Sequence, residues 1–269
     1  MITLKRMLKC KRKHKRHRVF RFGLCAAFLC AVGAMISVSA LKSRGLFFTT
    51  DFRKNEYPCR GAYITEDCGE INWEMFSHEP YDLVYIRAGQ GGSKTDKMYE
   101  QNAMGAAKNG IPFGLVHEFD YGVSGIRQAK SFVKKLNNCM LLPVLDIRMG
   151  LIERILYPDD RNNAYEINAF ADHICKEAGC GVILYCDEET YKRYDLERSG
   201  AIIWVEADCA DNVCHGWKLL TYSEYGRSRA VKTGERFSLF TAGKNITKDK
   251  LFEMLAGEWI GRKNMNYQK

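Results

Sequence analysis

Met140-Leu-Leu-Pro-Val-Leu-Asp146-Ile-Arg148 is an apolar run of strand length that ends in two charged residues. Side chains two positions apart in a strand point to the same face, so Asp146 and Arg148 are expected to emerge side by side. At the carboxyl end of a strand in a parallel barrel, this is where catalytic groups lie. A glycosidase requires a pair of carboxylates there, and this chain supplies one carboxylate and one guanidinium.

Seven further segments are short and mostly apolar, as expected of strands buried on both faces. Segments of helical period alternate with them, which predicts an α/β protein with a parallel sheet, and eight strands indicate a TIM-like (β/α) barrel. The connections around 207–217 and 222–236 are too short or too polar for full helices, so fewer than eight helices are expected. The expected strands are 60–64, 83–88, 111–117, 141–146, 182–186, 202–207, 217–222 and 236–240.

Three helices have clear sequence signals. Ser124 has the chemistry of an N-cap and precedes an apolar stripe that runs from Ile126 to Leu136. Apolar residues between Ile167 and Ala178 repeat at the spacing of one helix face. A third helix is expected over 96–109, with Gly110 at its C-terminal end.

The first 41 residues have the character of a membrane anchor. Residues 1–21 contain ten Lys or Arg residues and no acidic residue, and residues 22–41 carry no formal charge. About 20 apolar residues suffice to cross a bilayer as a helix, and a positive flank stays in the cytoplasm. The sequence thus predicts a basic cytoplasmic tail, one transmembrane helix and a body outside the cell. A cleaved signal peptide is the alternative, because Val38-Ser39-Ala40 resembles a cleavage site and the body would then be secreted.

The rest of the chain is nearly neutral. Outside the basic tail, 31 basic residues face 32 acidic ones, so the body carries no electrostatic footprint for nucleic acid. Residues 42–58 are expected to form a linker and residues 59–269 a single barrel domain. Eight of the eleven cysteines fall in the exported part, where disulfides are permitted, but 105 pairings are possible and none is assigned. Buried thiols are the alternative, and no Cys/His spacing predicts a metal site.

Six short motifs follow one another at consistent spacing. They are Gly61-Ala-Tyr-Ile-Thr-Glu-Asp-Cys-Gly69-Glu-Ile71-Asn-Trp73, Tyr85-Ile-Arg87-Ala88, the series Asp96, Tyr99, Asn102, Ala106, Gly110, Gly114 and His117, then Pro143-Val-Leu-Asp146, Ile183-Leu-Tyr185 and Ile203-Trp204-Val205. Together they resemble glycoside hydrolase family 25, the muramidases called Chalaropsis-type lysozymes, from about Gly61 to Gly243. The resemblance implies an eight-stranded barrel directed at bacterial peptidoglycan, with no cofactor. It names no protein partner.

The same resemblance implies that the active site is degenerate. Active members of the family use four acidic positions at the barrel mouth, and this chain keeps one of them, Asp146. The Asp of the opening strand is Tyr63, the Glu expected to act as general acid is Arg148, and a late-strand Asp aligns with Ser238. Glycoside hydrolysis needs a carboxylic acid to protonate the leaving oxygen, and arginine is always charged. Asp146 and Arg148 are therefore expected to form an ion pair.

Other residues are candidates for a surviving site. Glu118 and Glu206 end the third and sixth expected strands and are possible substitutes for the lost acid, with solvated charges as the simpler interpretation. His117, Tyr185, Trp204 and Tyr222 are candidates for sugar binding. For each, packing in the barrel core is the competing interpretation.

Three functions remain open at this point. The first is a membrane-anchored, non-catalytic module that binds peptidoglycan or scaffolds wall enzymes. The second is a working muramidase that cleaves between N-acetylmuramic acid and N-acetylglucosamine with Asp146 and a recruited acid. The third is a surface protein that keeps the barrel for protein contacts alone.

Overall fold

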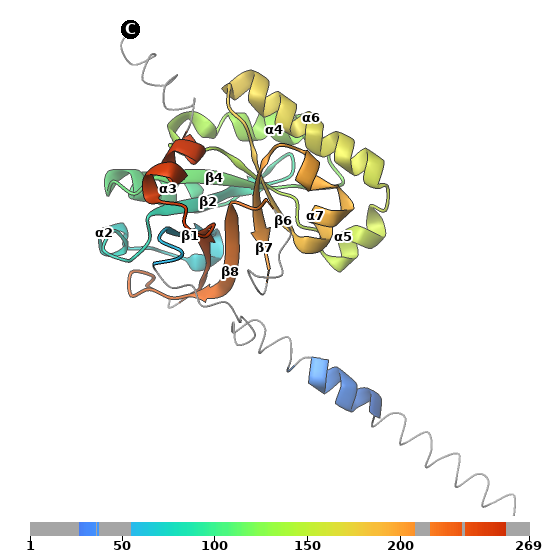
Figure 1. Ribbon diagram of the computed structural model, residues 1–269, viewed down its shortest axis with the longest axis horizontal. Helices are drawn as coiled ribbons and strands as arrows, with labels where there is room; N and C mark the ends of the chain where they lie inside the picture. Colours follow the sequence, from blue (N-terminus) through green and yellow to red (C-terminus); the bar gives the residue numbers. More distant parts are fainter. Residues whose placement is uncertain (1–26, 36, 38–54, 208–215, 233–234, 257–269) are drawn as a thin grey trace, which may run out of the picture. The chain divides into compact units, whose positions relative to one another are not determined.

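The computed structural model describes residues 27–35, 37, 55–207, 216–232 and 235–256, and the chain divides into two units, residues 1–47 and 48–269 (Figure 1). In the first unit the described residues 27–35 and 37 are helical. In the part of the chain that the structure describes, no helix has the length and apolar character needed to span a bilayer. Much of the predicted span 22–41, together with the basic tail, lies outside the described residues.

Short apolar runs of the second unit form the strands of a closed barrel. The barrel order is β1-β2-β4-β5-β6-β7-β8-β9, and pairing of β1 with β2 and with β9 closes it. The two-residue β3 (Lys94–Thr95) pairs with the end of β2. The barrel strands are β1 (Arg60–Ile64), β2 (Leu83–Gln90), β4 (Phe113–Glu118), β5 (Val144–Asp146), β6 (Ile183–Asp187), β7 (Ile202–Glu206), β8 (Leu219–Gly226) and β9 (Phe237–Ala242).

The direction of the last strand corrects the expectation of a wholly parallel sheet. Strands β1, β2 and β4 to β8 pair in parallel, but β9 runs antiparallel to both β8 and β1. A parallel crossover needs a dozen or more residues, usually with a helix, whereas only 227–236 join β8 to β9. The short, polar connection therefore fixes the reversed direction of β9.

The helices lie mainly in the earlier connections. They are α2 (Trp73–Phe76), α3 (Tyr99–Lys108), α4 (Gly125–Val133), α5 (Leu151–Leu156), α6 (Asp160–Ala178) and α7 (Glu188–Arg193), with short 3-10 turns η1 (Glu66–Cys68), η2 (Leu136–Asn138) and η3 (Leu196–Arg198).

The number of helices can be compared with the expectation for the barrel. The second unit has seven described α-helical segments, α2 to α7 and residues 248–256, and the helical residues 27–35 and 37 of the first unit bring the described total to eight. In the described residues of the β7–β8 and β8–β9 connections there is no helix. The described residues of the β8–β9 connection agree with the prediction, whereas most of the β7–β8 connection, 208–215, lies outside the described residues. The helix that follows β9 was not predicted.

Local signals explain where the predicted helices begin and end. The Ser124 side chain accepts a hydrogen bond from the Arg127 amide at 3.3 Å, which caps α4. Gly179 ends α6 in a left-handed conformation that glycine adopts without strain. Gly125 serves a packing role, since a Cβ there would lie 1.9 Å from the Glu166 carbonyl oxygen of α6.

Alternation along the strands divides the apolar side chains into two cores. One face of each strand packs against the helices, and the other fills the barrel lumen. Gly61 and Gly114 leave room in the lumen for the rings of Phe240 and Tyr85, which a Cβ would approach to 2.0 and 2.3 Å. The lumen is therefore a packed core. Its buried residues are Cys59, Tyr63, Leu83, Tyr85, Val116, Leu141, Val144, Ile183, Tyr185, Trp204, Leu219, Phe240, Ala242, Leu251 and Leu255.

Three cysteines of the barrel unit are free thiols, in line with the alternative to disulfides. Cys59 and Cys68 are buried free thiols that donate to the carbonyl oxygens of Ile246 and Arg236, and Cys175 is an exposed free thiol on α6. Burial raises the pKa of Cys59 to about 11, so this thiol stays protonated. Cys209 and Cys214 lie outside the described residues.

Candidate functional site

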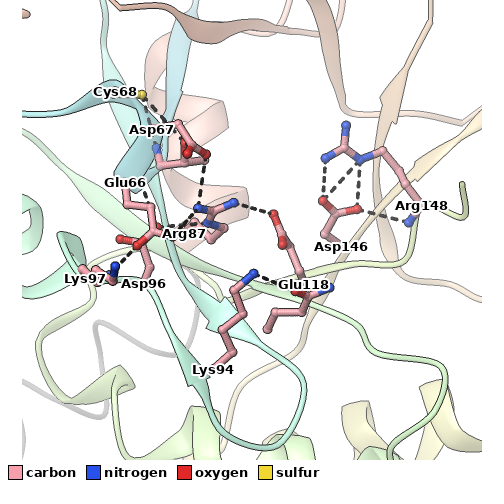
Figure 2. A network of polar contacts seen from close by, with 12 residues as sticks. Glu66, Asp67, Cys68, Arg87, Lys94, Asp96, Lys97, Glu118, Asp146 and Arg148 are labelled. Atoms are coloured by element: carbon pink, nitrogen blue, oxygen red, sulfur yellow. Dashed lines mark hydrogen bonds and ion pairs between the residues drawn. The ribbon is translucent and has the colours of Figure 1, made fainter. Parts of the chain in front are cut away.

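Charged side chains gather where β2, β4, β5 and β7 reach their carboxyl ends, which is the mouth of the barrel. They form two clusters, one around Arg87 and one around Arg148, which lie on neighbouring parts of the mouth in Figure 2. Glu118 of the first cluster is the register partner of Asp146 in the second.

The Arg148 cluster confirms that Asp146 and Arg148 face one another as an ion pair. The Arg148 Nε lies 3.0 Å from Asp146 Oδ1 and 3.2 Å from Oδ2, and its Nη2 lies 2.6 Å from Oδ2. The Arg148 backbone amide also donates to Oδ1 at 3.1 Å. Both carboxylate oxygens are thus occupied by donors from a single residue (Figure 2). Asp146 is 5% exposed, so little of it remains for any other partner.

A second carboxylate and an aromatic ring complete this cluster. Arg148 Nη1 pairs with Glu206 of β7, whose carboxylate accepts a hydrogen bond from the Tyr185 hydroxyl at 3.1 Å. The Arg148 guanidinium lies 4.2 Å from the Tyr185 ring centroid, which is a cation–π distance. Burial lowers the pKa of Arg148, but Asp146, Tyr185 and Glu206 outweigh it and hold this pKa well above its usual range. The group is therefore a permanent cation.

The Arg87 cluster is larger and joins three parts of the chain. Arg87 Nε pairs with Asp96 at 3.0 Å and Nη1 with Glu118 at 3.3 Å. Its Nη2 lies 3.4 Å from both Glu66 and Asp67 of η1. Asp96 is nearly completely buried and also accepts the backbone amides of Glu66 and Met98. This arginine therefore ties the β1–α2 and β2–α3 connections to the barrel.

The pKa of Glu118 is raised above its usual value. Its burial raises the pKa, and Asp146 raises it further, while the Arg87 guanidinium lowers it without cancelling the rise. Glu118 is thus a carboxyl group of the mouth whose surroundings favour the protonated form, next to a carboxylate that is ion-paired.

Tyr63 and Ser238 occupy adjacent strands at the same end of the lumen. They are register partners in the antiparallel β1–β9 pair. Tyr63 is 4% exposed, and its ring meets the rings of Tyr185 and Trp204 edge-on at 6.2 and 6.0 Å. Burial, Asp146 and Glu118 raise its pKa well above the usual range, so the phenol is neutral. The structure thus brings together Tyr63, Asp146, Arg148 and Ser238, the four positions where the family resemblance implies carboxylates.

The four residues expected to bind sugar are placed differently. Tyr185 and Trp204 are completely buried and stack at 4.6 Å, and the Trp204 indole donates to Thr221 at 2.8 Å. In this conformation neither presents an open ring face to a ligand. Tyr222 follows the lumen residue Thr221 in β8, and its electrostatic neighbours are Tyr81 and Arg60 rather than the mouth residues.

His117 lies in the outer core. Its ring stacks on Phe170 at 5.3 Å and contacts Phe132 at 5.1 Å, both from helices that cover the barrel. The ring nitrogen Nε2 lies 3.3 Å from the Gln128 side-chain oxygen, and burial lowers the His117 pKa to about 4. This histidine is neutral at pH 7 and turned away from the mouth, as in the packed interpretation.

Sequence reasoning missed two members of the mouth. Arg87 was visible only as part of a strand motif, although an arginine inside an apolar strand signals a need for buried carboxylates. Glu224 of β8 has a pKa raised by burial and by the nearby Glu206. It escaped notice because the register shifts between Thr221 and Gly226 displace the end of β8 from simple alternation. In the described residues no group of three His, Cys, Asp or Glu side chains has the geometry to hold a metal ion.

Comparison with known proteins places this barrel in a family. The model of glycosyl hydrolases family 25 matches residues 64–226, more than half of the chain. The chain therefore belongs to glycoside hydrolase family 25. Comparison with curated protein sequences gives no match.

Solved structures of low sequence identity share the fold. A family 25 glycosyl hydrolase from Bacillus anthracis is 21% identical with a TM-score of 0.63, covering 73% of this chain and 93% of that protein. A bacterial lysozyme from Streptomyces coelicolor is 20% identical with a TM-score of 0.62, covering 75% of this chain and 98% of that protein. A family GH25 lysozyme from Aspergillus fumigatus is 18% identical with a TM-score of 0.62, covering 74% of this chain and 99% of that protein.

Proposed function

We propose that this protein is a peptidoglycan-directed barrel whose hydrolytic site is impaired and which acts as a binding or scaffolding module. Family membership supports a glycan of the bacterial cell wall as ligand. The observation that carries the impairment is the contact of Arg148 with both oxygens of Asp146. A buried carboxylate that accepts from the same residue through both oxygens is a weaker nucleophile and base than a free one, because these contacts stabilise its charged form.

The lost general acid supports the same conclusion. Protonation of the leaving oxygen requires a group that holds and releases a proton near neutral pH. The position implied for that acid carries Arg148, whose surroundings keep it charged. Glycan contacts would instead come from the edges of the guanidinium and carboxylate groups that remain exposed at the mouth, among them Glu118 and Glu206.

The test is to incubate the purified chain, in detergent, with bacterial peptidoglycan and to measure two quantities. Sedimentation with insoluble peptidoglycan reports binding, and mass spectrometry of the soluble fraction reports new reducing ends. Binding without new reducing ends is the expected result. A folded sample that neither binds nor cleaves peptidoglycan contradicts the proposal and leaves protein contacts as the remaining use of the barrel.

An active muramidase is the second candidate, and one observation favours it. Glu118 has a raised pKa and lies on the strand next to Asp146, so it has the character of a recruited acid. In that case reducing ends at muramic acid form and are lost in both Glu118→Gln and Asp146→Asn. Glu206→Gln is the comparison variant, because Glu206 is the other candidate acid and pairs with Arg148 as Glu118 pairs with Arg87. Loss of activity in that variant alone would assign the role to Glu206.

Restoring the acids tests the degenerate positions directly. The triple variant Tyr63→Asp, Arg148→Glu and Ser238→Asp returns carboxylates to three neighbouring places of the mouth. We expect hydrolysis where the unchanged protein has none, provided that circular dichroism shows a folded barrel. A folded triple variant that binds peptidoglycan but stays inactive argues that further residues of the mouth have changed.

We also propose that residues 22–41 anchor the barrel outside the cell, with residues 1–21 in the cytoplasm. The uncharged segment and its basic flank support this arrangement. Retention in the membrane pellet after alkaline carbonate washing, with the full mass intact, is the expected result. A soluble chain that begins near Leu41 shows the alternative, a cleaved signal peptide.

A further inference from the structure

Helix α5 turns its apolar residues to solvent, whereas an ordinary surface helix turns them to the core. Leu151, Ile152, Ile155 and Leu156 are 63–75% exposed, and none of the residues of α5 is buried. At about 100° per residue these four side chains cover one face roughly 140° wide. The apolar face of α5 therefore points to solvent.

Charged contacts hold the helix in this orientation. Arg154, on the opposite side of α5, lies 3.1 Å from Asp187 at the end of β6 and also pairs with Glu189 of α7. Arg154 thus turns inward to the barrel rim and leaves the aliphatic side chains outside. Because the inward side is pinned by ion pairs, α5 cannot bury its apolar face by rolling over without breaking them.

The apolar face is unusual on this barrel. Of the eight large apolar side chains that are exposed in the described residues of the barrel unit, four belong to these six positions. Scattered exposed apolar residues are normal, whereas a contiguous patch marks an interaction site. The remaining four, Met75, Met104, Ile126 and Tyr165, each come from a different helix.

The area of the patch limits what covers it. Leu and Ile side chains each bury on the order of 100 Å², so a symmetric contact between two copies through α5 would bury about 800 Å² in total. Stable protein interfaces bury about 1,200–2,000 Å². The face is too small for a stable dimer, whereas an apolar helix face can lie in the interface of a bilayer, with a strength that scales with the apolar area buried.

The chain itself supplies the reason to choose a bilayer. Residues 22–41 are the proposed anchor, and residues 42–54 separate them from the described barrel unit. Thirteen residues reach at most about 45 Å when extended. A domain of this length has a radius of gyration of about 16 Å. The tether thus keeps the whole barrel within reach of the lipid surface.

We propose that the apolar face of α5 docks on the outer surface of the membrane that holds the anchor. The inference rests on the proposed anchoring and adds an orientation to it. Helix α5 begins five residues after Asp146, at the rim of the mouth, so docking brings the mouth beside the bilayer. The site would then address glycan strands next to the membrane. Since Arg154 is already paired, contact is apolar and does not require anionic lipid.

Photolabelling of the full chain in phosphatidylcholine vesicles tests this docking. A diazirine-bearing phosphatidylcholine labels side chains in contact with lipid, and trypsin then separates the relevant segments. Cleavage after Arg148, Arg154 and Arg161 yields peptides 149–154 and 155–161, which together carry all of α5. Label is expected in these two peptides and in 22–42. Peptide 98–108, which contains the exposed Met104, is expected to stay unlabelled.

Variants make the result specific. Replacing Leu151, Ile152, Ile155 and Leu156 by Ser should reduce labelling of 149–161 at least fivefold and leave 22–42 unchanged. Because these side chains are exposed, the fold should survive. Met104→Ser is the matched control and should change nothing. Increasing the salt concentration should not reduce the labelling.

Each other outcome overturns the docking and is distinct from failure of the proposed function. Label in 22–42 alone means that the anchor is right and the docking wrong. Self-cross-linking with α5 protected means that a second copy covers the face. Unlabelled 22–42 refutes the anchor, and the docking with it. None of these outcomes alters the peptidoglycan assay in detergent, which reports glycan binding by itself.

Discussion

Two arginines of the barrel mouth, Arg87 and Arg148, share a chemical group and differ in what surrounds it. Arg87 contacts four carboxylates from three chain segments, and one of them, Asp96, is nearly completely buried. Arg148 contacts two carboxylates and a ring, and its side chain is 28% exposed. Arg87 therefore acts as a structural tie between connections, whereas Arg148 occupies a site and neutralises it. A positive charge in an enzyme fold does not reveal by itself which of these roles it has.

Removing Arg87 should have the larger effect on stability. Arg87→Met leaves four carboxylates facing one another, with Asp96 buried and unpaired, and breaking such a buried pair costs about 3–5 kcal/mol. Urea unfolding followed by circular dichroism measures the difference. Arg198→Met is the matched control, since its pair with Asp195 is exposed and worth about 0–1 kcal/mol. Equal effects in both variants would contradict a structural role for Arg87.

Removing Arg148 should cost less, about 1–3 kcal/mol. Arg148→Met removes the side-chain donors of Asp146 but leaves its backbone amide contact at 3.1 Å, and the Glu206 partner is partly exposed to water. The same unfolding experiment compares the two arginines directly. If Arg148→Met proves as costly as Arg87→Met, the two clusters are structurally equivalent and the contrast fails.

The pH dependence of Glu118 should give a smaller effect, of about 1 kcal/mol or less. Because its folded pKa is raised, the folded state binds the proton more tightly than the unfolded state does. Stability relative to Glu118→Gln is thus greatest below the unfolded value of about 4.3 and falls as pH rises through the folded value. Unfolding free energies of both proteins at a series of pH values test this. A difference that grows with pH in favour of the unchanged protein refutes it.

The hydroxyl of Tyr185 tests the contribution of a single hydrogen bond. Tyr185→Phe removes one hydrogen bond to Glu206 and keeps the ring under the Arg148 guanidinium. A single such bond contributes about 0.5–1.5 kcal/mol, so a loss in this range is expected in the unfolding assay. Tyr185→Leu removes the ring as well and should cost more. Equal costs for the two variants would mean that the cation–π contact adds nothing.

Much of the barrel could be predicted from the sequence because its signals are local. Period-two and helical patterns, together with caps such as Ser124, place the elements within a few residues of their observed bounds. The direction of β9 depends on the length of the connection 227–236. This connection is too short for a parallel crossover, but the sequence pattern alone predicted a parallel sheet. The ion pair of Asp146 with Arg148 followed from spacing alone.

Contacts between distant segments were beyond the sequence. The partners of Arg87 lie up to 31 positions away, and the pairing of Tyr63 with Ser238 spans nearly the whole domain. Whether an aromatic ring lines a cleft or fills a core depends on such contacts. Trp204 and Tyr185 are completely buried because Gly61 and Gly114 allow the lumen to fill with rings, and no motif states this.

The pairing of β1 with β9 has a consequence for biogenesis. These strands are the first and the last of the barrel, so the ring of hydrogen bonds closes only when residues 60–64 meet residues 237–242. A chain whose decisive contact is so distant in sequence folds slowly and late. For a domain proposed to cross a membrane, this means that the barrel cannot close before almost all of the polypeptide has passed through the export channel. The chain would therefore stay unfolded enough to be transported. Under that proposal, the pairing of β1 with β9 would delay closure of the barrel until translocation is nearly complete.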